Sequence, residues 1–225
     1  MDILHRDDLT EGGFAGLREH RLIKDPAAFG PGANDDGSWP GLGNFVYLSD
    51  ARFMPHGDTR MHKHLEIDVI SIIERGRLAH QGSLGHGQDL RRNDVQIQRA
   101  GGEGFAHNEV NPDNQENHML QLWVLPEQAG QAADYKVYQP TTGGLFRIYG
   151  GQAGEADFPA STLIDIALLD AGQTITVPGS FIAYLSRGTG VVNGETVQPG
   201  NLLRGNELHF EAKDDTQLVV VHTAH

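Results

Sequence analysis

Short apolar runs separated by turn residues dominate this sequence, and they constrain the fold more than any other feature. The runs are rich in Val, Ile, Leu and aromatic residues, and the segments between them contain Gly, Pro and Asn. Short strands at regular spacing with turn residues between them favour an antiparallel sandwich or barrel. We therefore expect an all-β protein. The expected strands lie within residues 44–54, 67–85, 94–100, 117–126, 145–151, 161–172, 173–178, 180–205 and 207–225.

The two halves of the chain share one layout. Residues 67–100 run as a strand, a Glu-Arg-Gly turn, a second strand, a turn and a third strand. Residues 180–205 repeat this order with Ser-Arg-Gly and with Asn-Gly, a strong signal for a two-residue hairpin. We interpret the repeat as a duplicated jelly-roll unit. The small and polar residues of 126–144 mark the boundary, so we expect domains at 1–138 and 139–225.

The charge of the chain argues against nucleic-acid binding. Its 17 basic and 30 acidic residues give a formal charge of −13, which should repel phosphate backbones. No apolar run approaches the ~20 residues of a membrane-spanning helix, and the first residues lack the apolar core of a secretory signal. We expect a cytoplasmic protein. The absence of Cys leaves His, Asp and Glu as the strong metal ligands.

Two pairs of potential metal ligands occur at the spacing of one strand face. His62 and His64 form the first pair, and His107 and Glu109 form the second. Residues i and i+2 of a strand point to the same side, about 6.5–7 Å apart. The two pairs could thus supply three neutral nitrogens and one carboxylate to a divalent first-row metal. The alternatives are two histidines on a polar strand face and a surface acid at position 109.

Several spaced motifs resemble the pirin family of two-domain cupins. The stretches that carry the resemblance, in order, are "HKHLEIDVISIIERGRLAHQGSLG" (62–85), "NDVQIQRAGGEGFAHNEVNP" (93–112) and "LQLWVLPE" (120–127). The resemblance is dense from His62 to Pro126 and weak beyond it. It implies two tandem cupin domains, each an antiparallel jelly-roll β-barrel, with the metal in the N-terminal one and a degenerate C-terminal one.

The resemblance also implies a ligand set and an activity. The family's metal residues correspond to His62, His64, His107 and Glu109 of this chain. Pirins bind iron or another divalent metal; some open quercetin with dioxygen, and others are described as nuclear transcriptional cofactors. The chain departs from the family at Lys63, where Pro is usual, at Asp68 and Asn108, and in the approach "GDTRM" (57–61). These changes leave the ligands intact but alter the mouth of the pocket, so the substrate is open.

Other histidines and acids near the motifs have weaker claims as ligands. Glu66 and Asp68 are separated from His62 and His64 by even numbers of residues, so a regular strand would point all four side chains to one face. A bulge after His64 would turn the two acids away from the histidines. Four further histidines have no partner at ligand spacing, and we expect them at turns, at the rim or on the surface: His56, His80, His86 and His118. His118 could also reach the barrel interior and contact a metal ligand from behind. The C-terminal half has no His-x-His pair, so we expect no metal there.

We carry two functional hypotheses forward. The first is a quercetin 2,3-dioxygenase-like enzyme that opens a flavonol or related enol with O2, with Glu109 as the general base. Its cofactor would be one divalent ion, with Fe(II) expected first and Zn, Ni, Mn or Cu as alternatives. The second is a non-catalytic metal-binding regulator that acts through a partner protein. A cupin isomerase or a sugar-binding cupin is a third, weaker alternative. Neither nucleic acid nor membrane is expected as a partner.

Overall fold

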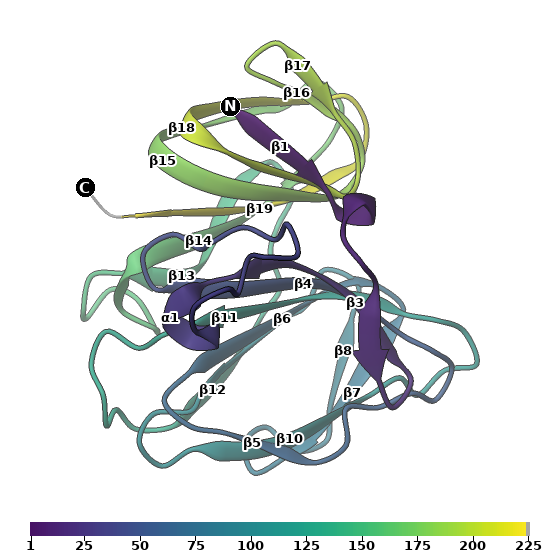
Figure 1. Cartoon of the computed structure of the whole chain (residues 1–225), viewed down its shortest axis with the longest axis vertical. Helices are drawn as coiled ribbons and strands as arrows, with labels where there is room; N and C mark the ends of the chain where they lie inside the picture. Colours follow the sequence, from purple (N-terminus) through teal and green to yellow (C-terminus); the bar gives the residue numbers. More distant parts are fainter. Residues whose placement is uncertain (224–225) are drawn as a thin grey trace. The chain divides into compact units, whose positions relative to one another are not determined.

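The fold is known from a computed structural model that describes residues 1–223, and nearly all of its regular structure is β (Figure 1). The first elements are β1 (Asp2–His5), η1 (Arg6–Asp8), β2 (Gly12–Phe14), β3 (Leu17–Lys24), α1 (Pro26–Phe29), β4 (Phe45–Phe53), β5 (His62–His64), β6 (Asp68–Arg75), β7 (Arg77–Gly82) and β8 (Gln88–Arg91). Next come β9 (Val95–Arg99), β10 (Phe105–Val110), β11 (His118–Val124), β12 (Asp134–Tyr138), β13 (Gly144–Gly151) and β14 (Ala160–Leu169). The last are β15 (Thr174–Arg187), β16 (Gly190–Val192), β17 (Glu195–Val197), β18 (Asn201–Ala212) and β19 (Thr216–Thr223). The all-β prediction is confirmed. No helix in the described chain is long and apolar enough to cross a membrane.

The chain forms two compact units, and each unit is made of more than one segment of the sequence. The N-terminal unit comprises Leu9–Pro40 and Asn44–Gln139. The C-terminal unit comprises Met1–Asp8, Gly41–Gly43 and the described residues from Pro140 onward. The first residues join the C-terminal unit because β1 pairs antiparallel with β18. The sequence-based domains 1–138 and 139–225 remain a proposal.

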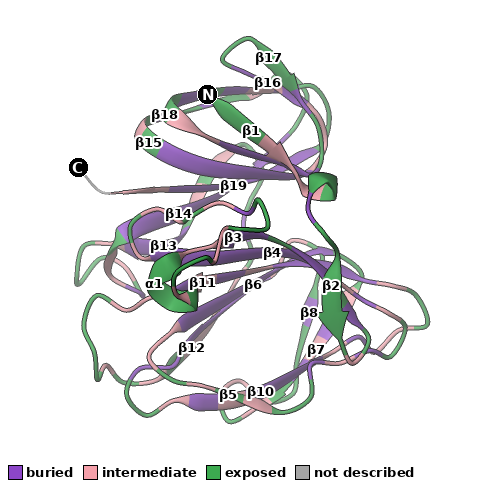
Figure 2. Ribbon diagram, viewed as in Figure 1, coloured by how far each residue is buried: buried purple, intermediate pink, exposed green. Residues whose placement is uncertain are grey.

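The N-terminal unit is built from two antiparallel sheets. The seven-stranded sheet has the order β12-β9-β6-β11-β4-β3-β2, and the four-stranded sheet has the order β5-β10-β7-β8. β4 is buried over nearly its whole length, including its polar residues Ser49 and Asp50 (Figure 2). The predicted turn between β6 and β7 centres on Gly76, whose φ is +79°. A Cβ there would lie 2.9 Å from the Cβ of Asn117, so only glycine fits.

The space between these two sheets changes character along the strands. At one end lies an apolar cluster of Leu17, Ala51, Phe53, Ile73, Leu78, Leu90 and Met119. Two residues further along β11 than Met119, the side chain of Gln121 hydrogen-bonds to Glu109 on the opposite sheet. Two residues further still, Trp123 contacts the ring of His64. Because alternate residues of a strand share a face, β11 passes from an apolar layer through a polar layer to a layer of imidazole and indole rings.

The C-terminal unit consists of an eight-stranded sheet, with β1 added at β18 and the other strands in the order β13-β14-β19-β15-β18-β16-β17. Its core is aliphatic and aromatic, with buried residues such as Phe181, Leu203 and Phe210. The predicted Asn-Gly hairpin is confirmed. Asn193 and Gly194 have φ values of +49° and +88° and join β16 to β17, as a type I′ turn requires.

Some sequence-based strand predictions need correction. Residues 173–178 and the run beginning at 180 were expected to be separate strands, but β15 runs through both. The register shifts between Val177 and Ser180, so Pro178 and Gly179 form a bulge instead of a turn. The sequence also gave no reason to expect strands before residue 44. β3 was hidden by its charged residues, one of which, Glu19, is buried because Arg21 and Tyr47 donate hydrogen bonds to it.

One histidine of the N-terminal unit lies between two buried acids. His118 is 6% exposed, with Nδ1 3.1 Å from Glu74 and Nε2 2.8 Å from Asp50. Burial alone would lower the pKa of His118, but the hydrogen bonds and charges of Asp50 and Glu74 outweigh it and raise the pKa above 6.5. The imidazolium therefore stabilises the junction of β4, β6 and β11.

We predict that His118→Gln lowers the free energy of unfolding by about 3 kcal/mol near pH 6, the order expected when one partner of a buried charge pair is removed. A raised pKa contributes stability that is present below pH 6.5 and is lost as the pH rises through the folded-state pKa. The difference between wild type and variant should thus shrink toward pH 9 in urea titrations. The exposed His56→Gln variant is the control. A difference that grows with pH would contradict this assignment.

Candidate metal centre

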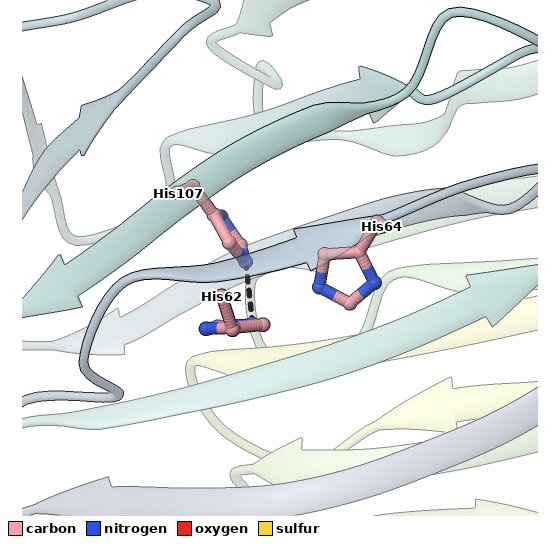
Figure 3. Close-up of side chains that lie close together, drawn as sticks. All are labelled: His62, His64 and His107. Carbon is pink, nitrogen blue, oxygen red and sulfur yellow. Dashed lines mark hydrogen bonds between the residues drawn. The ribbon is translucent and has the colours of Figure 1, made fainter.

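The register of two short strands brings three histidines together. β10 pairs antiparallel with β5, so that His107 lies opposite His62 and Phe105 lies opposite His64. Directly opposed residues of antiparallel strands share a face, and so do residues i and i+2 of one strand. His62, His64 and His107 must therefore point to the same side of the four-stranded sheet. Figure 3 shows the three rings converging from these two strands.

The three imidazoles are close enough to bind one ion. Their ring centroids are 4.5 Å apart for His62 and His107, 4.9 Å for His62 and His64, and 5.0 Å for His64 and His107. One nitrogen of each ring lies within 4.8 Å of the others, and no Asp or Glu among residues 1–223 joins this group. His64 Nε2 is buried and makes no hydrogen bond within the described chain. Converging nitrogens, one of them left without a partner, fit a divalent first-row metal.

The surroundings keep the imidazoles of His64 and His107 neutral. Burial, with a smaller contribution from His62, lowers the pKa of His64 to about 4. Burial and the neighbouring His62, His64 and His80 lower the pKa of His107 to about 2. Neutral imidazole is the form that ligates a metal, so the low pKa values keep His64 and His107 in that form at neutral pH.

Two hydrogen bonds orient the rings from behind. His62 Nδ1 donates to the carbonyl oxygen of Arg60 at 2.9 Å, which leaves the lone pair on His62 Nε2. Arg60 has a φ of +56°, a conformation that is uncommon for a residue with a side chain. His107 Nδ1 lies 3.0 Å from the amide of Gln98 on β9. Such contacts to the second ring nitrogen fix the orientation of metal-binding histidines.

Glu109 lies on the same strand face as His107 but outside the histidine group. It is fully buried, and its carboxylate accepts hydrogen bonds from Ser71 at 2.6 Å, from Gln121 at 3.0 Å and from Gln96 at 3.3 Å. Burial raises the pKa of Glu109 to about 7, and the hydrogen bonds from Ser71 and Gln121 offset part of this increase. Within residues 1–223, Glu109 Oε2 accepts a single side-chain hydrogen bond, from Gln121, so it keeps acceptor capacity toward a fourth ligand position or a substrate proton. Its roles as ligand and base remain proposals.

The structure places the two neighbouring acids away from the histidines. Glu66 has a φ of +51°, and its Oε1 accepts a hydrogen bond from the backbone N–H of Gly130 at 2.9 Å. Asp68 is buried and accepts two hydrogen bonds from the guanidinium of Arg99 at 3.1 Å. Both acids are therefore directed away from the histidines, as expected from a turn of the chain after His64.

His80 differs from its sequence-based interpretation. It was expected at a turn, at the rim or on the surface, but it is 1% exposed and its ring lies 5.7 Å from that of His107. The reason is the register of β7 on β10, which sets His80 opposite Glu109. His80 Nε2 donates to the carbonyl of Leu84, and its ring stacks on Tyr135 at 5.7 Å. His80 thus forms part of the wall behind His107.

Sequence reasoning also missed the polar and aromatic residues around the histidines. Gln96 and Gln98 alternate with Val95 and Ile97 on a strand that is buried throughout, a pattern that could have indicated a polar interior. The aromatic residues near the histidines show no comparable sequence pattern, because they come from separate segments of the chain. Trp123 lies 5.7 Å from His64, Tyr47 lies 4.4 Å from Trp123, and Phe29 of α1 stacks on Trp123 at 5.9 Å.

An open pocket of about 310 Å³ lies at the strand that carries the first histidine pair. Its lining includes Lys63, His64, Glu103 and Phe105. Lys63 is exposed, as expected for a residue whose neighbours on both sides point inward. Lys63 thus places a positive charge at the outer edge of the histidine strand, where the pirin family usually has proline.

Comparison with known proteins supports the resemblance seen in the sequence. The Pirin family model matches residues 41–124. A provisionally named quercetin 2,3-dioxygenase of Zymomonas mobilis is 27% identical over 189 residues, which cover 78% of this chain and 80% of that protein. The quercetin 2,3-dioxygenase of Escherichia coli K12 is 32% identical over 76 residues, 33% of this chain and 32% of that protein.

Solved structures share the fold over nearly the whole chain. The E. coli bacterial pirin YhhW in complex with nickel(II) aligns with a TM-score of 0.81 and 16% identity over 98% of this chain and 97% of that one. The quercetin 2,3-dioxygenase of Acinetobacter baumannii aligns with a TM-score of 0.73 and 21% identity over 99% and 85% of the two chains. The pirin resemblance and the fold of two tandem cupin domains are therefore confirmed.

We predict that the protein binds one divalent metal per chain. His62→Ala, His64→Ala and His107→Ala should each remove most of it, because every change deletes one of three donors. Acidification should release the metal, because protonated imidazole cannot bind it. Elemental analysis after gel filtration gives the stoichiometry, with the exposed His209→Ala as control. A metal content near two, or one that is unchanged in His107→Ala, would contradict the assignment.

Proposed function

Because residues 41–124 match the pirin family and three imidazoles converge in the same unit, we propose that the protein is a metal-dependent dioxygenase. Its substrate would be a flavonol or a related enol, and its second substrate would be O2. The observation that carries this proposal is the group of His62, His64 and His107 beside the indole of Trp123. A metal in this group would be a Lewis acid adjacent to an aromatic surface.

The metal would be held by three imidazoles, with Glu109 as the proposed fourth ligand. We propose Fe(II), with Zn, Ni, Mn and Cu as alternatives, because imidazole suits all of these ions and selection depends on availability. Such an ion would stabilise the anionic form of a substrate hydroxyl and bring it together with O2. Three imidazoles and one carboxylate would leave a divalent ion with a net positive charge, which favours an anionic oxygen of the substrate.

Glu109 is the proposed general base. A base operates best when its pKa is near the working pH, and burial brings the pKa of Glu109 to about 7. The described side chains that donate hydrogen bonds to it, Ser71, Gln96 and Gln121, are all neutral. Glu109 can therefore accept the proton of an enol hydroxyl in a water-poor interior.

The aromatic side chains beside the histidines favour a planar substrate. Phe29 and Trp123 are nearly parallel, with an interplanar angle of 11°, and Tyr47 packs against Trp123. Phe29 is 38% exposed, so it is the part of this stack that reaches solvent. Stacked rings bind flat aromatic molecules with little loss of conformational entropy. Several relatives are named quercetin 2,3-dioxygenase, and quercetin is a planar flavonol.

One observation favours the regulatory alternative. Met61 and Leu65 flank β5 and are 58% and 64% exposed. Exposed apolar side chains on either side of a metal-binding strand could form a surface for a partner protein that senses the metal. This alternative predicts a full metal site without oxygen consumption.

We predict that the iron-loaded protein consumes O2 with quercetin and that Glu109→Gln slows turnover by about 10²–10⁴-fold, the range for loss of a general base. Metal content should fall far less, because three imidazoles remain. An oxygen electrode and elemental analysis measure the two effects, with Glu195→Gln, at an exposed position of the C-terminal unit, as control. No oxygen uptake with any flavonol or enediol at full metal occupancy would favour the regulatory alternative.

We predict that Phe29→Ala raises KM for a flavonol about fivefold and changes kcat less, because it removes a stacking contact worth about 1 kcal/mol. Phe14→Ala is a matched control, since Phe14 is 50% exposed on β2 of the same unit. Steady-state oxygen uptake separates the two constants. Equal KM values for Phe29→Ala and wild type would exclude Phe29 from the substrate surface.

A further inference from the structure

The amide of Gln98 contacts the ring of His107 from the side opposite to the other histidines. Gln98 is fully buried on β9, and its Nε2 lies 3.0 Å from His107 Nδ1. Its other amide atom, Oε1, is buried without a hydrogen-bond partner in the described chain. The backbone on either side of the amide is held by the ladders of β9 with β6 and β12. The side chain is therefore fixed in place but has one unused polar atom.

The contacts around His107 form a chain of hydrogen bonds with a single consistent direction. The amide N–H of Gln98 donates to His107 Nδ1, so the proton of this neutral ring is on Nε2. His107 Nε2 lies 3.0 Å from His62 Nε2 and donates to it. His62 Nδ1 then donates to the carbonyl of Arg60. In this arrangement His107 has no lone pair available at the metal position, whereas His62 has one.

A metal ligand requires the opposite tautomer of His107. Its Nε2 must be unprotonated to bind an ion, so its single proton must move to Nδ1. A protonated Nδ1 needs an acceptor, and the amide N–H of Gln98 would clash with it. A half-turn of the Gln98 amide presents Oε1 instead, and Oε1 is the atom that has no other partner to lose.

We propose that Gln98 is a positioning residue that sets the tautomer of His107 and that its amide reverses when metal binds. In the metal-free protein the amide donates to His107 Nδ1, and His107 donates to His62. In the loaded protein the amide accepts from His107 Nδ1–H, and both Nε2 lone pairs face the ion. This inference rests on the metal site but not on the proposed reaction.

The choice of an amide has a physical consequence that a carboxylate would not have. An amide can donate or accept, so it stabilises His107 in both states, whereas a carboxylate only accepts. A carboxylate partner would favour Nδ1–H even without metal, and the lone pairs of His62 and His107 would then face each other at 3.0 Å. Compared with a carboxylate at this position, Gln98 thus stabilises the metal-free pocket and gives a lower metal affinity.

The test uses two variants with opposite expected effects. Gln98→Met removes the hydrogen bond with little change in volume and should weaken Zn(II) binding about 10–100-fold, as for other contacts behind a metal ligand. Gln98→Glu should bind Zn(II) at least as tightly as wild type at pH 8, while its metal-free form melts at a lower temperature. Gln88→Met, at an exposed position on β8, is the control. Competition with a chromophoric chelator gives the dissociation constants, and circular dichroism checks the fold.

A second measurement reads the tautomer directly and needs neither O2 nor a flavonol. The ¹⁵N shifts of the His107 ring should show Nε2–H in the metal-free protein and Nδ1–H in the Zn(II)-loaded protein. The same tautomer in both states, or wild-type Zn(II) affinity in a folded Gln98→Met variant, would overturn the proposal. Loss of oxygenase activity alone would count only against the proposed function.

Discussion

The candidate site depends on the antiparallel register of β5 on β10. That register sets His62 opposite His107 and lets His64 reach the same ion from two residues further along. A shift of one residue would turn both histidines of β5 to the outer face, because the side-chain period of a strand is two. The inner face is in turn specified by burial, since His107 and Glu109 are fully buried while Lys63 is exposed. Hydrophobic patterning and metal chemistry therefore select the same register.

The polar layer around Glu109 separates the apolar end of the unit from the histidines. Ser71, Gln96 and Gln121 come from three strands of the seven-stranded sheet and meet one carboxylate of the facing sheet. Buried polar groups are costly unless they are hydrogen-bonded, so this layer is stable only as a complete network. The network is neutral apart from Glu109, and this explains why burial rather than a charged partner determines the raised pKa of that residue.

The sequence predicted the elements of the site better than its surroundings. The spacing of His62 and His64 is a local pattern, and strand alternation converts it directly into a shared face, whereas His107 joins them through the register of β10 on β5. Most strands after residue 44 and the Asn193-Gly194 turn were predicted from equally local patterns, but β12 was not, because residues 126–144 were interpreted as a domain boundary. His80 and Trp123 could not be assigned in this way, because their places depend on which strands pair and in which register. β1 illustrates the same point, since its partner β18 lies about 200 residues away in the chain.

The central claim is that His62, His64 and His107 hold one divalent metal in the N-terminal unit. Anomalous X-ray diffraction tests this most directly, with crystals of the iron-loaded protein measured on both sides of the iron absorption edge. The account predicts a single strong anomalous peak per chain, within bonding distance of one nitrogen from each of the three rings. A peak at any other set of residues, or none between the rings at full iron content, would contradict it.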